Sequence, residues 1–222
     1  TEELKVKLAD ATALVVRNRT QVTREIIEAA PQLKIIARAG VGLDNIDIKA
    51  ADDNGVIVSA ALGINATAVG EETLAMALAL SRKLIELDSS TRAGEWNRKA
   101  GSEISGKTWG LLGFGATARA TAELLKGFKV KVLAYDPFAK PTNEYLASIN
   151  ATMASINDVV AQSDVISVHL PSTPETKEII NAQLLSTMKK SALLINVGRG
   201  EVINEADLES ALKSGVIAGA GL

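Results

Sequence analysis

Three small residues follow a short apolar run at residues 109–112, and the last of them lies inside a helix-forming stretch at residues 116–125. Their spacing is Gly113-x-Gly115-x-x-Ala118. The first glycine allows a tight turn, the second lets a pyrophosphate approach the backbone, and the third small residue packs helix against strand. The N–H groups at the positive end of the helix are then free to bind an anion. The pattern therefore predicts a dinucleotide site, although glycine turns also serve plain strand–helix packing.

An acidic residue at the end of the next apolar run supports the dinucleotide interpretation. The run at residues 130–135 is followed by Asp136, 23 positions after Gly113 (136 − 113). A carboxylate near this place accepts both ribose hydroxyls of NAD and repels the 2′-phosphate of NADP. Since no arginine follows within residues 137–140, the motif favours NAD. The alternative is that Asp136 only ends a strand before Pro137.

Composition narrows the class of protein. Of 222 residues 47% are hydrophobic and only 3% aromatic, which suits a parallel sheet with an aliphatic core, covered by helices on both faces. A net charge of −2 gives no reason to expect nucleic acid or an anionic membrane as a partner. Without cysteine and with one histidine, we expect neither disulfides nor a metal site. No apolar run approaches the length of a membrane span and no signal peptide is visible, so we expect a cytoplasmic protein.

Strands and helices alternate along the chain, as in parallel α/β folds. The first part predicts strands at 13–16, 33–37 and 56–59, helices at 22–30 and 45–53, and one long helix at 67–92. The polar segment 94–106 predicts a domain boundary, with one lobe at residues 1–93 and another at 94–222. The second lobe predicts strands at 109–112, 130–135, 165–169, 193–197 and 216–219, and helices at 116–125, 157–162, 181–189 and 205–213. The fold class is therefore α/β, with two parallel-sheet lobes.

Four ordered blocks resemble the D-isomer-specific 2-hydroxyacid dehydrogenases. The blocks are Arg38-Ala-Gly-Val-Gly-Leu-Asp-Asn-Ile-Asp47, residues 106–119, His169-Leu-Pro-Ser-Thr-Pro-Glu-Thr176 and Ile195-Asn-Val-Gly-Arg-Gly200. The resemblance implies a Rossmann-type NAD-binding domain and a smaller, partial flavodoxin-like substrate domain. It also implies hydride transfer between NAD and the α-carbon of a D-2-hydroxy acid, whose product is the 2-keto acid. Members acting on 3-phosphoglycerate in serine biosynthesis are the most similar, and the family commonly forms homodimers or higher homo-oligomers.

The resemblance places the catalytic arginine at Arg199. A guanidinium fork binds a carboxylate and polarises a carbonyl together, which a lysine ammonium does poorly. The alternative is that Arg199 only caps a strand or pairs with a carboxylate.

The resemblance also implies residues that bind substrate in the first lobe. Backbone N–H groups of Gly40, Val41 and Gly42 would receive the substrate carboxylate, or these residues form an ordinary turn. Beyond the first strand, Arg17 and Arg19 would bind a substrate phosphate; the alternative is that they are only solvated at the surface. Asn65 would face the cleft that holds the active site.

His169 is the only histidine, yet the resemblance argues against a role as general base. The family usually carries another strand and helix before Thr1 and its catalytic glutamate and histidine after Leu222, so we expect a chain truncated at both ends. We instead expect a wall of the cofactor site to be formed by His169, Pro171, Thr173, Asn196 and Val197. The family's usual cation after the second glycine is replaced by Ala116 and Thr117, which leaves the phosphates to backbone N–H groups and the Thr117 hydroxyl.

Two other functions fit the same motifs. An NAD(H)-sensing interaction module, like corepressors with this fold, would bind NAD and recruit a partner without turnover. A hydrolase that retains NAD on the same nucleotide fold is a third possibility, but its substrate residues are not visible here.

Overall fold

The computed structural model describes residues 2–222, which fall into two compact units that meet between Ile64 and Asn65. The sequence predicted this boundary at residue 94, after the long helix. That helix belongs to the second unit because it packs there: Gly70 lies so close to helix α6 (Ala116–Leu125) that an added Cβ would stand 3.1 Å from the backbone nitrogen of Thr121. Ala77, about two turns further along the same helix, is fully buried in the core of the second unit.

The first unit is a three-stranded parallel sheet in the order β1-β2-β3. Its strands are β1 (Ala13–Val16), β2 (Ile35–Arg38) and β3 (Ile57–Ala60), and its helices are α1 (Glu2–Leu8), α2 (Arg24–Glu28) and α3 (Ile48–Asp53). Leu14, Val16 and Ile36 point into a core shared with α2 and α3. On alternate positions Val15 and Ile57 are 71% and 66% exposed, so one sheet face is covered and the other is not.

The second unit is a six-stranded parallel sheet in the order β6-β5-β4-β7-β8-β9. The strands are β4 (Thr108–Leu112), β5 (Lys131–Tyr135), β6 (Ala151–Met153), β7 (Val165–Val168), β8 (Leu193–Asn196) and β9 (Gly219–Gly221). The helices are α4 (Ala66–Ser81), α5 (Leu84–Arg92), α6 (Ala116–Leu125), α7 (Asn143–Ser148), α8 (Ile156–Gln162), α9 (Ala182–Ser186) and α10 (Glu205–Ser214). Two short 3₁₀ helices, η1 (Lys126–Phe128) and η2 (Gly200–Val202), complete it.

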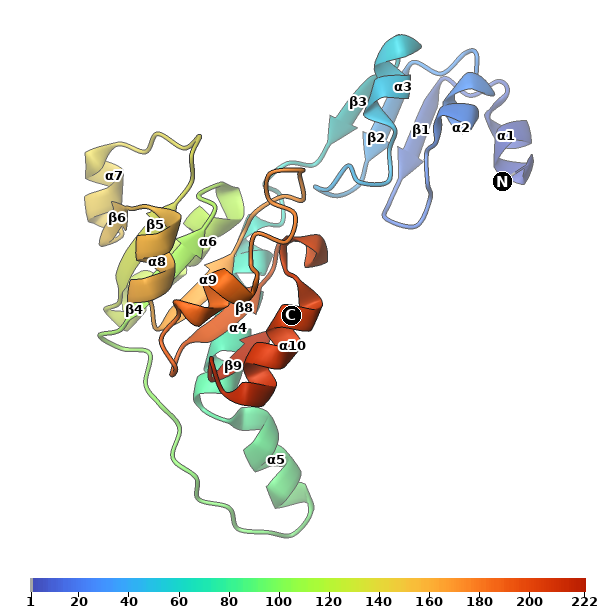
Figure 1. Cartoon of the computed structure of the whole chain (residues 1–222). Coiled ribbons are helices and arrows are strands. Elements are labelled where there is room, and N and C mark those ends of the chain that lie inside the picture. Colours follow the sequence, from blue (N-terminus) through green and yellow to red (C-terminus); the bar gives the residue numbers. More distant parts are fainter. Residues whose placement is uncertain (1) are drawn as a thin grey trace. The chain divides into compact units, whose positions relative to one another are not determined.

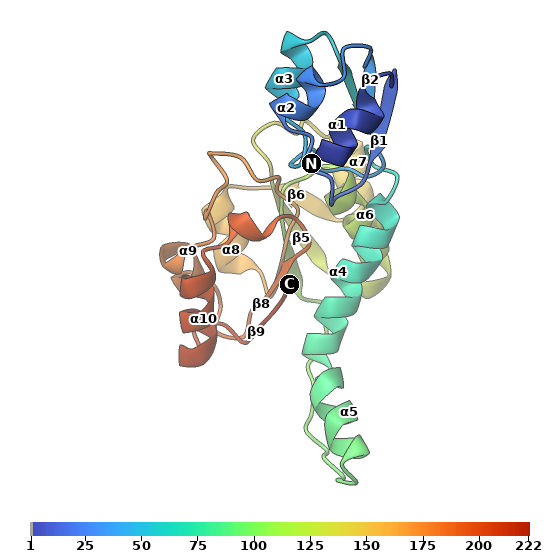
Figure 2. The ribbon, with the colours of Figure 1, turned by 90° about the vertical axis from the view of Figure 1, so that its right-hand side faces the viewer.

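Helices cover both faces of this second sheet. Within the unit, α4 and α6 lie on one side of the strands while α8, α9 and α10 lie on the other (Figures 1 and 2). Two buried aliphatic clusters fill the layers between sheet and helices. The predicted aliphatic α/β core and the Rossmann-like architecture are therefore confirmed.

The structure departs from the predicted elements at three places. The helix predicted at 67–92 is broken after Ser81, because Lys83 adopts a left-handed conformation (φ 56°) and α5 starts anew. Helix α7 and the three-residue edge strand β6 were missed, since neither carries a periodic apolar pattern long enough to detect. The last strand lies at Gly219–Gly221 instead of 216–219, since Ile217 packs into the core before it.

Helix α5 and the following polar segment project from the body of the second unit (Figure 1). Three of its apolar side chains are largely exposed: Leu84 at 53%, Ile85 at 74% and Trp96 at 85%.

Candidate functional site

The register of the second sheet places four predicted site loops along one edge. Leu112 at the end of β4 pairs with Tyr135 of β5 and Val168 of β7, and Val168 in turn pairs with Asn196 of β8. All four strands are parallel, so the loops that follow them leave at the same carboxyl edge. The chain crosses from β4 to β5 on one side and continues at β7 on the other, and such a switch point is where ligands bind in open α/β sheets.

The glycine turn after β4 has the backbone that its sequence predicts. Gly113 has φ 93°, and a Cβ there would lie 2.9 Å from the backbone oxygen of His169. Only glycine fits both demands. At Gly115 an added Cβ would meet nothing within 4 Å, so the space above the turn is open.

The amino end of α6 presents unused hydrogen-bond donors. The first α6 N–H group with an acceptor belongs to Arg119, which donates to the Gly115 oxygen (3.0 Å). Those of Ala116, Thr117 and Ala118 have no acceptor among residues 2–222. Backbone donors and the helix dipole together make this end suitable for an anion.

Asp136 is tied to the glycine turn. Its Oδ2 accepts from the Phe114 N–H (2.8 Å), and its Oδ1 accepts from the N–H groups of Phe138 (2.8 Å) and Ala139 (3.0 Å). Burial alone would raise the pKa of Asp136, but these three donors outweigh it and hold the pKa below its ordinary value. Since a carboxylate has roughly four acceptor positions, about one remains for a ligand hydroxyl.

Arg119 belongs to the same turn and was not singled out from the sequence. Its Nε donates to the Phe114 oxygen (3.0 Å), and its guanidinium lies 5.3 Å and 5.6 Å from the ring centres of Phe114 and Tyr145. Its charge also contributes to the lowered pKa of Asp136. Its place one helical turn after Gly115 is the feature of the sequence that could have identified it as part of the site.

His169 joins the helix end to the core of the sheet. Its Nδ1 lies 3.2 Å from Thr117 Oγ1, and its Nε2 lies 3.0 Å from Ser167 Oγ, which also accepts from Trp109 Nε1 (2.9 Å). Burial lowers the pKa of His169 to about 3. The ring is therefore neutral at physiological pH and unsuited to carry a proton in acid–base chemistry there.

The loop after β7 is closed by a residue that the sequence analysis did not select. Thr176 Oγ1 donates to the Pro171 oxygen (2.6 Å) and accepts from the Thr173 N–H (2.9 Å). Pro171 and Thr173 are thus held in one compact turn next to His169.

The loop after β8 is built around Asn196. Its side chain accepts from the Gly198 N–H (3.0 Å) and donates to the Arg199 oxygen (3.0 Å). A Cβ at Gly198 would lie 2.7 Å from the Leu170 oxygen, so this loop packs directly against the β7 loop. Val197 packs on the core, and Arg199 Nη1 donates to the Gly198 oxygen (3.2 Å).

In the first unit, the loop after β2 carries Gly40, Val41 and Gly42. The guanidinium of Arg38 folds over it, since a Cβ on Gly40 would stand 2.1 Å from Arg38 Nη1. That nitrogen donates to the Ala39 oxygen (2.9 Å), while the buried Arg38 Nε has no partner among the described residues. Arg38 begins the first block of the family resemblance, but the sequence predicted no role for it.

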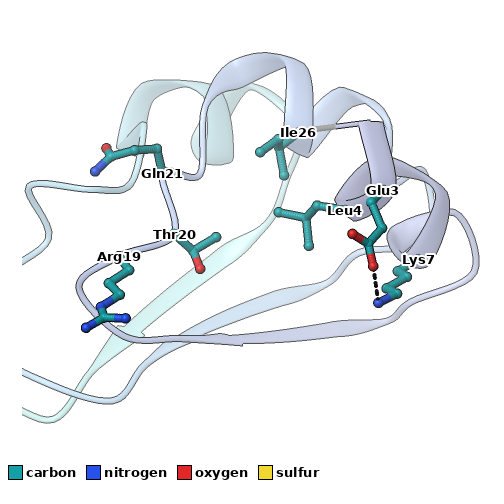
Figure 3. Close-up of a pocket in the computed structure, with 7 residues that line it drawn as sticks. All are labelled: Glu3, Leu4, Lys7, Arg19, Thr20, Gln21 and Ile26. Carbon is teal, nitrogen blue, oxygen red and sulfur yellow. Dashed lines mark hydrogen bonds and ion pairs between the residues drawn. The ribbon is translucent and has the colours of Figure 1, made fainter.

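The two arginines after β1 lie in one exposed loop of this unit. Both are exposed, and the side chain of Asn45 fixes their loop by donating to the Arg17 and Thr20 oxygens. Arg19 lines a hollow of about 500 Å³ whose apolar floor is Leu4 and Ile26, whereas Arg17 does not line it. Figure 3 shows Arg19 at one end of this hollow and the Glu3–Lys7 ion pair at the other.

The remaining predicted residue, Asn65, precedes α4 in the second unit. It is exposed, and its backbone oxygen accepts from the Val69 N–H (3.0 Å). Among the described residues no cluster of acidic and histidine side chains could hold a metal ion. None of the helices between residues 2 and 222 is long and apolar enough to cross a membrane.

The fold agrees with comparison to known proteins. Residues 74–222 match the family model of the D-isomer specific 2-hydroxyacid dehydrogenase NAD binding domain. The chain therefore belongs to the D-isomer specific 2-hydroxyacid dehydrogenase family and carries its NAD-binding domain. The predicted family and cofactor are confirmed.

Individual relatives extend the match over the whole chain. It is 41% identical to D-3-phosphoglycerate dehydrogenase of Mycobacterium leprae over 99% of its length and 40% identical to that of Methanocaldococcus jannaschii over 100%. It spans only 42% of the length of each.

Solved structures give the same picture. An acyclic imino acid reductase (Bsp5) in complex with NADPH and D-Arg matches with TM-score 0.91 and 32% identity, over 100% of this chain and 71% of that one. D-lactate dehydrogenase from Aquifex aeolicus, complexed with NAD and lactic acid, matches with TM-score 0.90 and 29% identity, over 98% and 66%.

Proposed function

We propose that the protein to which this chain belongs interconverts D-3-phosphoglycerate and 3-phosphohydroxypyruvate with NAD, as a step of serine biosynthesis. The observation that carries the proposal is the identity of 41% to a D-3-phosphoglycerate dehydrogenase across 99% of the chain. The loops at the carboxyl edge of the second sheet supply a chemistry consistent with it.

The cofactor is assigned to the glycine turn and its neighbours. Its diphosphate lies on the N–H groups of Gly115 to Ala118, where the structure leaves donors and space. Asp136 accepts a ribose hydroxyl at its remaining acceptor position. The nicotinamide side is lined by the compact loops after β7 and β8, which carry His169, Pro171, Thr173, Asn196 and Val197.

Arg199 is assigned to the substrate. Its guanidinium binds the substrate carboxylate and the oxygen on the α-carbon, so that the carbonyl is polarised in the reducing direction. Bound NAD supplies the hydride acceptor in the oxidative direction. Gly40, Val41 and Gly42 give backbone N–H groups to the carboxylate, Asn65 borders the substrate, and Arg17 and Arg19 bind its phosphate.

No residue assigned here takes the substrate's hydroxyl proton. His169 is excluded because burial holds its pKa at about 3. Asp136 is excluded because it is bound to the glycine turn by three N–H groups.

The decisive experiment is NADH oxidation by the full natural protein, with 3-phosphohydroxypyruvate compared with pyruvate as substrate. We expect the phosphorylated keto acid to be preferred, and Arg199→Lys to lower kcat/KM by about 10²–10³-fold. Equal rates for both keto acids would remove the phosphoglycerate assignment. NAD binding without turnover of any 2-keto acid would instead favour a sensing module.

We also propose that the protein forms a homodimer through the projecting α5 segment. This segment carries three large apolar side chains that are mostly exposed, Leu84, Ile85 and Trp96, and burial of such side chains favours association. Sedimentation should give twice the chain mass for the wild-type protein and the monomer mass for a Trp96→Glu, Ile85→Glu variant. A wild-type monomer would refute this assignment.

A further inference from the structure

A line of hydrogen bonds leads from the buried core of the second sheet to the open end of α6. It passes from Trp109 to Ser167, then to His169, and ends on Thr117. Trp109 and Ser167 are fully buried, whereas Thr117 is partly exposed and Ala116 beside it is exposed. The line therefore connects groups that must be satisfied internally to a hydroxyl within reach of a ligand.

The direction of this line follows from the number of donors at each group. The indole Nε1 of Trp109 can only donate, so Ser167 Oγ accepts there. If His169 Nε2 also donated to Ser167, the Ser167 hydroxyl proton would have no acceptor among the described residues, in a fully buried place. An unpaired buried donor is costly. Ser167 therefore donates to Nε2, and His169 carries its proton on Nδ1.

The same logic fixes the hydroxyl at the end. His169 Nδ1–H donates to Thr117 Oγ1 across 3.2 Å, so this oxygen acts as an acceptor and its own proton is unused. No other partner of the Thr117 hydroxyl exists among residues 2–222, although its backbone oxygen accepts from Thr121. Thr117 is the second residue of α6, beside the free N–H groups and the open space above Gly115.

We infer that Ser167 and His169 are positioning residues that hold Thr117 as a hydrogen-bond donor to the cofactor diphosphate. The inference rests on the proposed cofactor site and names the group that replaces a cation there. In contrast to an arginine, the Thr117 hydroxyl donates a hydrogen bond to the diphosphate without adding charge. Ser167 and His169, which lie in the sheet, set the direction of that hydrogen bond.

The chain offers an unusually clear first test, because His169 is its only histidine. In nitrogen-15 NMR without ligand, the ring signals that disappear in His169→Gln should be those of a neutral ring protonated on Nδ1, the minor form in water. Ser167→Ala should shift that ring toward the Nε2–H form, because the donor to Nε2 is gone. An Nε2–H ring in the wild-type protein would overturn the inference, whether or not NAD binds.

Calorimetry with NAD tests the second half. Thr117→Val should weaken NAD and ADP binding about tenfold, the loss of one hydrogen bond to a charged group, while adenosine binding is unchanged. Thr117→Ser should restore it. Thr121→Val, which removes a buried hydroxyl one turn further along α6, is the matched control and should bind NAD as the wild type does.

Ser167→Ala should weaken NAD binding several-fold although Ser167 itself lies in the core, since Thr117 would then donate to Nδ1 instead of to the ligand. Equal NAD affinity of wild type and Thr117→Val would overturn the role of Thr117. Failure of the wild-type protein to bind NAD would refute the proposed cofactor site itself, a result distinct from both.

Discussion

The chain contains two glycine loops that follow parallel strands, and they are fixed in opposite ways. The loop after β4 is enclosed by its neighbours: Asp136 binds its Phe114 N–H, and the His169 backbone lies against Gly113. The loop after β2 is tied to backbone where the Gly40 oxygen accepts from the Ala61 N–H (3.1 Å), and the Arg38 side chain folds back over Gly40. One loop is held by backbone and a carboxylate, the other by backbone and a guanidinium that can swing aside.

The sheets beneath the loops differ in the same sense. Strand β7 is buried at every position, and helices cover both faces of its sheet. Strand β1 alternates between buried and exposed residues, and Val15 remains 71% exposed. The turn after β4 thus follows a strand that is buried at every position but its first, whereas in the first unit the residues of β1 alternate between buried and exposed.

The largest effect is expected from Gly113→Ala. A Cβ at φ 93° is strained and would lie 2.9 Å from backbone that cannot swing aside, so we expect a loss of about 3 kcal/mol in unfolding free energy and no NAD binding. Hydrogen exchange of the Leu111 amide measures the unfolding of this unit. Gly115→Ala is the control: nothing lies within 4 Å of its Cβ, so stability should hold while NAD binding weakens.

The pH dependence of stability should reveal the neutral histidine. The folded-state pKa of about 3 lies below the ordinary value of 6.5, so between these values the unfolded chain binds a proton that the folded chain does not. Stability therefore falls as the pH falls, by about 2 kcal/mol between pH 7 and pH 5. His169→Gln should lack this part of the loss in urea unfolding at the two pH values. Equal losses in both proteins would contradict the buried neutral ring.

How far the sequence predicted this molecule depends on the kind of signal. Helix α6 was predicted at its observed bounds, because the glycine turn and the run of helix-forming residues mark both ends. The family blocks pointed to His169, Asn196 and Arg199, which the register brings to one edge. What each of these residues does there remains a prediction.

Other features left no local trace. The break at Lys83 has no glycine or proline to announce it, and the membership of α4 in the second unit follows from its packing on α6. The hydrogen-bonded line from Trp109 through Ser167 and His169 to Thr117 joins three separate segments, so no spacing rule could have connected them. Long-range contacts of this kind are settled by packing and appear only in the structure.

A smaller effect is expected from replacing two similar carboxylates, of which only one is proposed to bind the ligand. Asp136 and Asp164 each accept backbone N–H bonds and have a lowered pKa despite burial, which would raise it. Both therefore stabilise the fold above their unfolded pKa, and this contribution is lost as the pH falls through the folded value.

We expect Asp136→Asn and Asp164→Asn each to cost about 1–2 kcal/mol at pH 7 and to reduce the loss of stability in acid. Only Asp136→Asn should weaken NAD binding, because Asp164 pairs with Lys189 and Thr108 at the opposite end of the sheet. Calorimetry and urea unfolding of both variants measure the two effects. A weaker NAD affinity in Asp164→Asn would show that binding follows overall stability.

The smallest expected effect compares the arginines that close the two loops. Arg119 donates to the Phe114 oxygen and lies over two aromatic rings, so Arg119→Met should cost about 1–2 kcal/mol. Arg38 donates to the Ala39 oxygen but keeps a buried Nε without a partner. Arg38→Met removes one hydrogen bond and one unsatisfied donor together. The two effects on the free energy of unfolding nearly cancel, so we expect a change within about 0.5 kcal/mol.

Hydrogen exchange reads the two units separately, from the Ile36 amide in β2 and the Leu111 amide in β4. If Arg38→Met destabilised β2 as strongly as Arg119→Met destabilises β4, the guanidinium over Gly40 would be a structural clamp instead of a movable cover. A movable cover leaves the N–H groups of Val41 and Gly42 available to a substrate carboxylate, as their proposed role requires, whereas the Gly40 N–H already donates to the Arg38 oxygen (2.8 Å). The pair of variants therefore tests whether the arginine side chains contribute differently to the stability of the two loops.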